Sequence, residues 1–165
     1  MSRVGIEQYL YLLDQAFESS TTQEHGLLTN LASVSDDEWL WVPGGGQRSM
    51  AEIAEHVGEC MFMYADHGFG DGSMSWHEFD ARYQPLPGKE QMMAWLREGH
   101  TVFRGRVDAL KDDSQLTELR KAPWGGEYET RWLIAAMIEH DLYHAGEINH
   151  IRALAQQNDA WPDYD

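Results

Sequence analysis

Apolar residues recur every three to four positions along four long stretches of the chain, the period of an amphipathic helix. The first stretch runs from about Ile6 to about Leu31. The second follows Ser49, which forms a capping-box signature with Glu52 three residues later, and should end near His67, before a run of glycines. The pattern predicts two helices in the first half of the chain.

The second half carries the other two periodic stretches. The third helix is expected from about Pro87 and Gly88 to about Leu110, and the fourth and strongest from about Glu129 to about Gln157. Residues 116–124 between them could form a short extra helix or a loop. Strand signals are weak, because the only alternating run, residues 127–130, is short and leads straight into the last helix.

The connection between the second and third helices is long, running from Gly68 to Pro87. A helix of about 20 residues spans roughly 30 Å, and about twenty extended residues can cover about 66 Å. The chain can therefore return along the whole bundle before the third helix begins. We expect an all-α fold, a four-helix bundle with a long helix 2–helix 3 crossover, in a single domain over residues 1–165.

The composition of the chain excludes some classes of binding partner. The 165 residues include 28 acidic and 12 basic side chains, which gives a formal net charge of −16. Such a chain repels phosphate backbones and anionic lipid, so we expect no nucleic-acid or membrane partner. Cys60 is the single cysteine, so no internal disulfide or cysteine-based metal cage can form. With 42% hydrophobic residues, the chain can bury a substantial core.

Targeting signals are weak. No apolar run approaches the roughly 18 residues needed to span a bilayer. The first residues, Met1 to Gly5, lack the apolar stretch of a secretory signal. The expected location is the cytoplasm.

Two histidines in the last helix carry the strongest chemical signal. His140 and His144 are four residues apart, which places their Cβ atoms about 5–6 Å apart on one helix face, a spacing that suits two ligands of one metal ion. They share a stripe with apolar residues that must face the core: Leu133, Met137, Ile148 and Ile151. Asp141 falls off this stripe, so we expect it to point outward or to support a histidine on a neighbouring turn.

A third histidine strengthens the metal hypothesis. His56 shares a face of the second helix with Ile53, Cys60 and Met63, so it should also point inward. Three neutral histidines and one open position hold catalytic zinc, and nickel, cobalt or iron(II) accept the same ligands. The alternative is that these histidines are hydrogen-bonded core residues without a metal.

Other polar residues are weaker candidates. Cys60 lies one turn from His56, but a lone buried cysteine usually packs as a small hydrophobe. His67 is about 16 Å from His56 along the helix, too far to share an ion. Glu147 could bond a ligand or a metal-bound water, or lie in solvent. The remaining histidines are expected on the surface or in grooves: His25, His77, His100 and His150. Five tryptophans are expected to pack in the core and at its rim: Trp39, Trp41, Trp95, Trp124 and Trp132.

These residues together resemble the DinB superfamily of small bacterial metal-binding proteins, which is related to thiol-dependent S-transferases. The likeness rests on His56 in the second helix and on His140, Tyr143, His144, Gly146 and Glu147 in the fourth, and covers almost the whole chain. It implies a four-helix bundle in up-down-down-up order, with His56, His140 and His144 as metal ligands, and a homodimer.

The same resemblance implies a function class. Some relatives transfer low-molecular-weight thiols to small electrophilic substrates, so a metal-dependent transferase that uses zinc or nickel, or else iron or cobalt, is the leading expectation. A metal-dependent hydrolase and a non-catalytic metal- or ligand-binding homodimer are the alternatives. Glu147 and Tyr143 are the nearest candidates for a catalytic acid or base. The acidity of the chain disfavours anionic substrates unless Arg48, Arg82 or Arg131 lines the site mouth.

Overall fold

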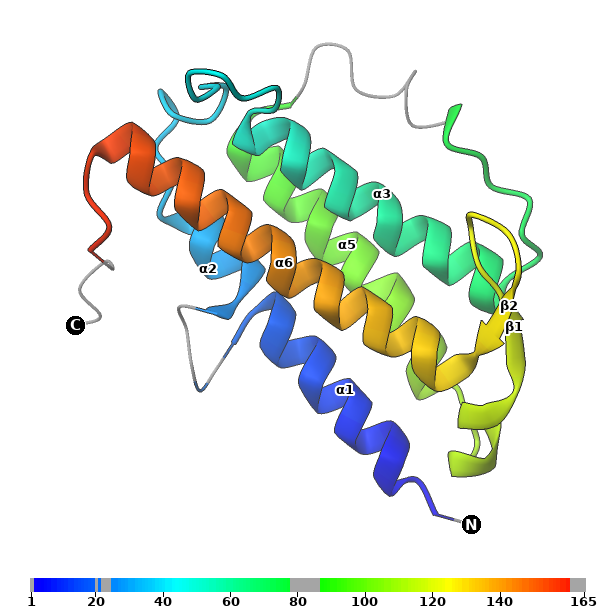
Figure 1. Cartoon of the computed structure of the whole chain (residues 1–165). Coiled ribbons are helices and arrows are strands. Elements are labelled where there is room, and N and C mark those ends of the chain that lie inside the picture. The colour runs from blue at the N-terminus through cyan, green and yellow to red at the C-terminus, as the bar shows by residue number, and fades with distance from the viewer. Residues whose placement is uncertain (1, 20, 22–24, 78–86, 161–165) are drawn as a thin grey trace.

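A computed structural model describes residues 2–19, 21, 25–77 and 87–160. Among them it shows four main helices packed together, with a short two-stranded sheet at one end (Figure 1). The elements in chain order are α1 (Val4–Phe17), α2 (Leu27–Ala32), α3 (Met50–Phe69), α5 (Lys89–Asp108), the 3-10 helix η2 (Asp113–Thr117), β1 (Leu119–Lys121), β2 (Glu127–Glu129) and α6 (Thr130–Gln156).

Helices α3 and α5 run in the same direction. Gly58 of α3 packs so closely on Trp95 of α5 that a Cβ atom added to the glycine would lie 2.1 Å from the indole ring. Further along both helices, the rings of Tyr64 and Phe103 meet at 6.3 Å. Two consecutive long helices can be parallel only if the connection returns along the bundle. The expected crossover is therefore present, although residues 78–86 of it lie outside the described residues.

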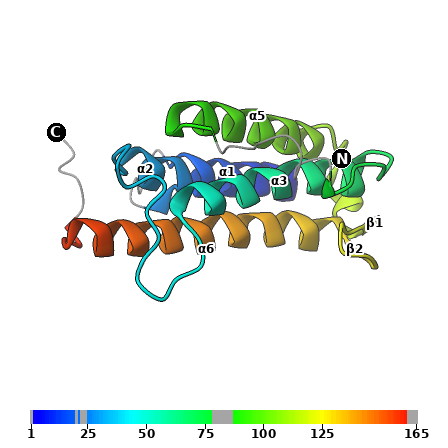
Figure 2. The ribbon, with the colours of Figure 1, turned by 90° about the horizontal axis from the view of Figure 1, so that it is seen from above.

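The other two main helices run the opposite way. Arg3 at the start of α1 pairs with Asp108 at the end of α5, and Asp14 near the end of α1 pairs with Arg104 of α5. Leu133, near the start of α6, lies against Gly68 near the end of α3. His140, further along α6, lies against His56 in the first half of α3. The order is up-down-down-up. Seen from above, α5 and α6 occupy opposite sides with α1 and α3 between them (Figure 2).

The first predicted helix is wrong in one respect, because the stretch from Ile6 to Leu31 is two helices. Helix α1 ends at Phe17 and α2 begins at Leu27. The run from Glu18 to His25 contains no apolar residue that could hold a helix against the core. At Gly26 the chain passes so close to itself that a Cβ atom would lie 2.8 Å from the backbone nitrogen of Ser19.

The predicted start of the second helix is confirmed. The Ser49 hydroxyl accepts a hydrogen bond from the Glu52 backbone at 3.3 Å, and the Ser49 backbone N–H donates to the Glu52 carboxylate at 2.7 Å. This capping box satisfies backbone N–H groups that a helix leaves unpaired at its first turn. It also fixes the start of α3, and with it the position of His56 two turns further on.

The hairpin before α6 was not predicted as such. Residues 116–124, expected as a short helix or a loop, contain the end of η2 and the strand β1, which pairs antiparallel with β2 so that Arg120 faces Tyr128. Gly125 and Gly126 have φ angles of +94° and +83°, which residues with a side chain rarely adopt. Those two glycines allow the chain to reverse over a very short distance.

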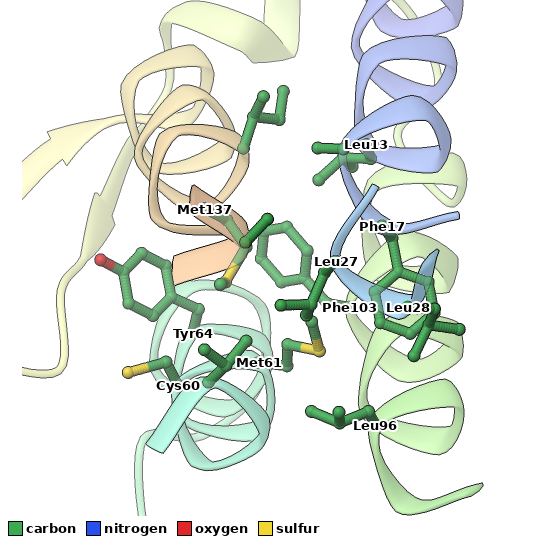
Figure 3. Close-up of a cluster of buried hydrophobic side chains, with 14 of the residues drawn as sticks. Leu13, Phe17, Leu27, Leu28, Cys60, Met61, Tyr64, Leu96, Phe103 and Met137 are labelled. Atoms are coloured by element: carbon green, nitrogen blue, oxygen red, sulfur yellow. The ribbon is translucent and has the colours of Figure 1, made fainter. Parts of the chain in front are cut away.

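The core lies between the main helices and contains leucine, methionine and phenylalanine side chains from all of them (Figure 3). Cys60 and Tyr64, one turn apart on α3, lie at the edge of this cluster, with their sulfur and hydroxyl on the side away from Leu13 and Leu28 (Figure 3). No helix of the described residues is long and apolar enough to cross a membrane.

Candidate metal centre

Three histidines converge on the seam between α3 and α6. One ring nitrogen from each of His56, His140 and His144 lies within 4.8 Å of the other two. The Nε2 atoms of His56 and His140 are 3.1 Å apart. The antiparallel packing of α3 and α6 produces this arrangement, because it places the first half of α3 opposite the middle of α6. Among the described residues, no other group with metal-ligand spacing is found.

The donor set fits a transition metal. Nitrogens that bind one tetrahedral zinc ion at 2.0–2.1 Å lie about 3.3 Å apart, close to the separation of the His56 and His140 nitrogens. Burial lowers the pKa of all three histidines, and their mutual proximity lowers those of His56 and His140 further. The pKa of His140 falls to about 3. All three rings are therefore neutral at pH 7, the form that binds a metal.

A carboxylate orients one of these rings. The Nδ1 atom of His144 donates a hydrogen bond of 2.8 Å to Oε2 of Glu147, which leaves Nε2 of His144 as the free lone pair. The other carboxylate oxygen of Glu147 accepts a hydrogen bond of 2.9 Å from Arg48. Glu147 therefore contacts a histidine of the cluster and does not lie free in solvent.

The family follows from a match over most of the chain. A family model described as the DinB superfamily matches residues 20–148, a range that contains all three histidines. The chain belongs to the DinB superfamily. No curated protein matched it. The match begins after α1 and so rests on α2 to α6, the part of this DinB protein that carries the histidine cluster.

Cys60 lies beside the cluster but is not part of it. Its sulfur is 3.8 Å from Nε2 of His56, yet it is not within ligand spacing of all three histidines. Burial, with Glu59 and Asp141 nearby, raises the pKa of the Cys60 thiol to about 12. In this DinB protein Cys60 is therefore a neutral, buried thiol, in agreement with its interpretation as a small hydrophobe.

The expectation that Asp141 points outward is wrong. Its side chain is fully buried, and neither carboxylate oxygen has a hydrogen-bond partner among the described residues. Burial raises the pKa of Asp141 well above its usual value. The sequence predicts a buried stripe of α6 centred on the histidines. In the structure α6 packs against α1, α2 and α3 together. The buried face of α6 therefore extends further around the helix than predicted. Thr130, Ile134, Asp141, Ala145 and Arg152 all belong to that buried face.

Tyr143 and the other histidines lie outside the three-histidine cluster. Tyr143 is 68% exposed and its ring lies 5.0 Å from that of His144, so it stands at the rim of the site. His67 bonds the carbonyl oxygen of Met74 at 2.9 Å, away from the cluster, as expected. His100 lies in a groove against Asp14. His25, His77 and His150 are exposed, as expected for surface residues.

Of the three arginines considered for the site mouth, the structure brings Arg48 to it. Arg131 pairs with Glu129 at the start of α6, and Arg82 lies outside the described residues. The sequence offers Arg48 as a candidate for the site mouth, but no residue spacing relates it to the histidines. The signal that could have placed it is its position immediately before the capping-box serine, which fixes it at the first turn of α3.

Proposed function

We propose that this DinB protein is a metal-dependent transferase of low-molecular-weight thiols that acts on a small electrophilic substrate. His56, His140 and His144 are the proposed ligands of one divalent ion, zinc or nickel in the first instance. The observation that carries the proposal is the convergence of three neutral imidazoles on one point of the α3–α6 seam. The choice of thiol over water is supported by the resemblance of the chain to a superfamily in which some members transfer low-molecular-weight thiols.

The proposed ion supplies positive charge at an open position, which lowers the pKa of a thiol or of water placed there. The protein's own residues determine how the site is held. Glu147 keeps the proton of His144 on Nδ1 and so directs Nε2 toward the ion. Arg48 fixes Glu147 through its second oxygen and places a guanidinium near all three histidines, whose pKa values it helps to lower.

In the proposed reaction the thiol loses its proton to solvent, and a sulfur electron pair forms a bond to the electrophilic carbon. A leaving group departs with the electrons of its own bond to that carbon. Tyr143, exposed at the rim beside His144, is the proposed proton donor to the departing group. Glu147 is already engaged by His144 and Arg48, so in this proposal it positions a ligand and does not transfer a proton.

The test is consumption of a thiol in the presence of an electrophile. Metal-loaded protein is incubated with glutathione, bacillithiol or mycothiol and with 1-chloro-2,4-dinitrobenzene, and thioether formation is followed by absorbance. The proposal expects metal-dependent turnover that disappears in the His56→Ala/His140→Ala/His144→Ala variant. The control variant is His150→Ala, an exposed histidine on the same helix. If the loaded protein never exceeds the rate of free metal with any thiol, the transferase proposal is wrong.

A further inference from the structure

Four aromatic side chains, three from the hairpin and the start of α6 and one from α3, meet at the hairpin end of the α3–α6 seam. The rings of Tyr128 and Trp132 stack with centroids 4.4 Å apart and planes 18° apart. Trp124, in the hairpin turn, lies 6.0 Å from Trp132 and 5.3 Å from Tyr64 of α3. Its indole N–H donates a hydrogen bond of 3.4 Å to the Tyr128 hydroxyl. We call these four residues the aromatic cluster.

The aromatic cluster is open to solvent on one side. Tyr64 is buried, but Trp124 is 51% exposed and Trp132 is 46% exposed. Of the five tryptophans expected in the core and at its rim, two are buried, Trp39 and Trp95, and three are partly exposed, Trp41, Trp124 and Trp132. A contiguous exposed apolar patch of this kind marks an interaction site, either for a ligand or for another protein. Their contacts with each other hold the rings in place before any ligand arrives.

The aromatic cluster lies on the same seam as the histidines. Tyr64 follows His56 on α3, and Trp132 precedes His140 on α6, each by just over two helical turns, or about 12 Å of helical rise. A small side chain lies midway along each of these two helix segments: Cys60 between His56 and Tyr64 on α3, and Ala136 between Trp132 and His140 on α6. Figure 3 shows Cys60 and Tyr64 at the same edge of the core. Between the two sites, each helix therefore carries a small side chain at this position.

We infer that the aromatic cluster is a subsite that binds the aromatic ring of a substrate whose other end reaches the three histidines. The ring contacts the exposed faces of Trp124 and Trp132, as aromatic rings do in offset or edge-to-face pairs. The ligand class is a neutral, extended aromatic molecule. This inference rests on the proposed function for the role of the histidine end, but the ring-binding end is independent of it.

Charge favours a neutral ring over an anionic one. The protein carries a net charge of −16. The arginines near the hairpin are already paired: Arg131 with Glu129 at 2.5 Å and Arg120 with Glu118 at 3.0 Å. Arg48, the guanidinium that acts on the three histidines, is at the far end of the seam. An anionic group is therefore less favoured at the aromatic cluster than near Arg48.

The first experiment measures ring binding without metal. The neutral fluorophore N-phenyl-1-naphthylamine is titrated into the protein in the presence of a chelator. Trp124→Ala and Trp132→Ala should each weaken binding tenfold or more. Trp41→Ala is the matched control, since Trp41 is also partly exposed, at 37%, and belongs to the loop before α3. Thermal unfolding of each variant, followed by circular dichroism, shows that the helices remain folded.

Three results would overturn the inference: no binding by the parent, unchanged binding in both cluster variants, or an equal loss in Trp41→Ala. Size-exclusion chromatography can give a fourth result that would overturn the inference. If Trp124→Ala and Trp132→Ala convert a dimer to a monomer, the aromatic cluster is an interface between copies of this chain and not a ligand subsite. None of these results depends on whether the histidines bind metal.

The second experiment tests the connection to the histidines. A series of hydroxamates carrying a phenyl ring on spacers of increasing length competes for the metal-loaded protein. Affinity should rise to an optimum at a spacer that covers about 12 Å, and Trp132→Ala should abolish the optimum while leaving acetohydroxamate binding unchanged. Affinity independent of spacer length would contradict a ring subsite on this seam. Failure of the protein to load metal would instead contradict the proposed function, and the fluorophore titration would still decide the subsite.

Discussion

Glu147 and His144 are joined by a hydrogen bond of 2.8 Å across one turn of α6. The carboxylate fixes which nitrogen of the imidazole carries the proton, and the guanidinium of Arg48 holds the carboxylate in turn. Glu147, which contacts the histidine, and Arg48, which holds Glu147, are therefore both in place before a ligand arrives. The arrangement is the one by which metal-binding histidines are commonly oriented in proteins.

Replacing Glu147 should weaken metal binding without removing a ligand. Glu147→Ala is expected to lower the affinity for zinc or nickel about 10- to 100-fold, because His144 loses its orientation and its preferred tautomer. Glu147→Gln should lose less, since its amide oxygen can still accept from Nδ1. Glu139→Gln, on an exposed position of the same helix, is the control. Competition titration with a chromophoric chelator measures all three, and equal affinities for the parent and Glu147→Ala would contradict this role.

Acid should destabilise the metal-free protein through the histidine cluster. The folded-state pKa of each of the three histidines is lowered, so the unfolded chain binds more protons below its ordinary pKa of about 6.5. The stability they contribute is present above pH 6.5 and is lost as the pH falls toward the folded values, about 3 for His140. Each neutral histidine adds a slope of up to about 1.4 kcal/mol per pH unit.

Urea unfolding at pH 7.5, 6.5, 5.5 and 4.5 measures this effect in chelator-treated protein. The variant with alanine at positions 56, 140 and 144 should show a shallower loss of unfolding free energy over that range. His100, whose pKa burial also lowers, is present in both proteins and cancels in the comparison. The same slope in parent and variant would mean that the three histidines are not buried in their neutral form.

Asp141 is expected to cost stability at neutral pH. Its folded-state pKa is raised by burial, so ionisation of the unfolded chain above about pH 4 favours unfolding. Asp141→Asn keeps the shape and removes the charge. It should raise the melting temperature of the metal-free protein at pH 7.5, with a gain of about 1.4 kcal/mol for each pKa unit that burial adds. The gain should shrink at pH 4.5; a gain independent of pH, or a loss at pH 7.5, would contradict the assignment of Asp141 as a buried, unpartnered acid.

The α3–α5 contact gives a matched pair of glycine substitutions. Gly58→Ala should destabilise the protein by about 1–3 kcal/mol, because its Cβ atom would overlap the Trp95 ring at 2.1 Å. Gly105→Ala, on an open position of α5 with no atom within 4 Å of the new Cβ, should stabilise it by about 0.5–1 kcal/mol. Thermal and urea unfolding of both variants measure the difference. Equal stability of the two variants would mean that α3 and α5 are not packed this closely.

The sequence carried the information for α3, α5 and α6, because their apolar periods are long and Ser49 and Glu52 mark a start. It also indicated that α3 and α5 are parallel, through the length of the connection between them. The break between α1 and α2 was missed, since the apolar residues on either side of it keep a compatible period. The hairpin was missed because three-residue strands carry almost no pattern of their own.

The sequence also predicted part of the candidate site. His140 and His144 follow from spacing within one helix, and His56 from its inward face. The proximity of His56 to the other two depends on the register between α3 and α6, which no local pattern encodes. The same register brings Glu147 to Arg48 and buries Asp141, so the roles of these residues became visible only in the folded protein.

Metal content tests the central claim most directly. Untagged protein purified without chelator is analysed by plasma mass spectrometry beside His144→Ala and the triple variant with alanine at positions 56, 140 and 144. The account predicts close to one equivalent of a single transition metal in the parent, a strong reduction in His144→Ala with a modest loss of stability, and none in the triple variant. A parent that holds no metal even after reconstitution with zinc or nickel, or a triple variant that keeps the parent's content, would contradict it.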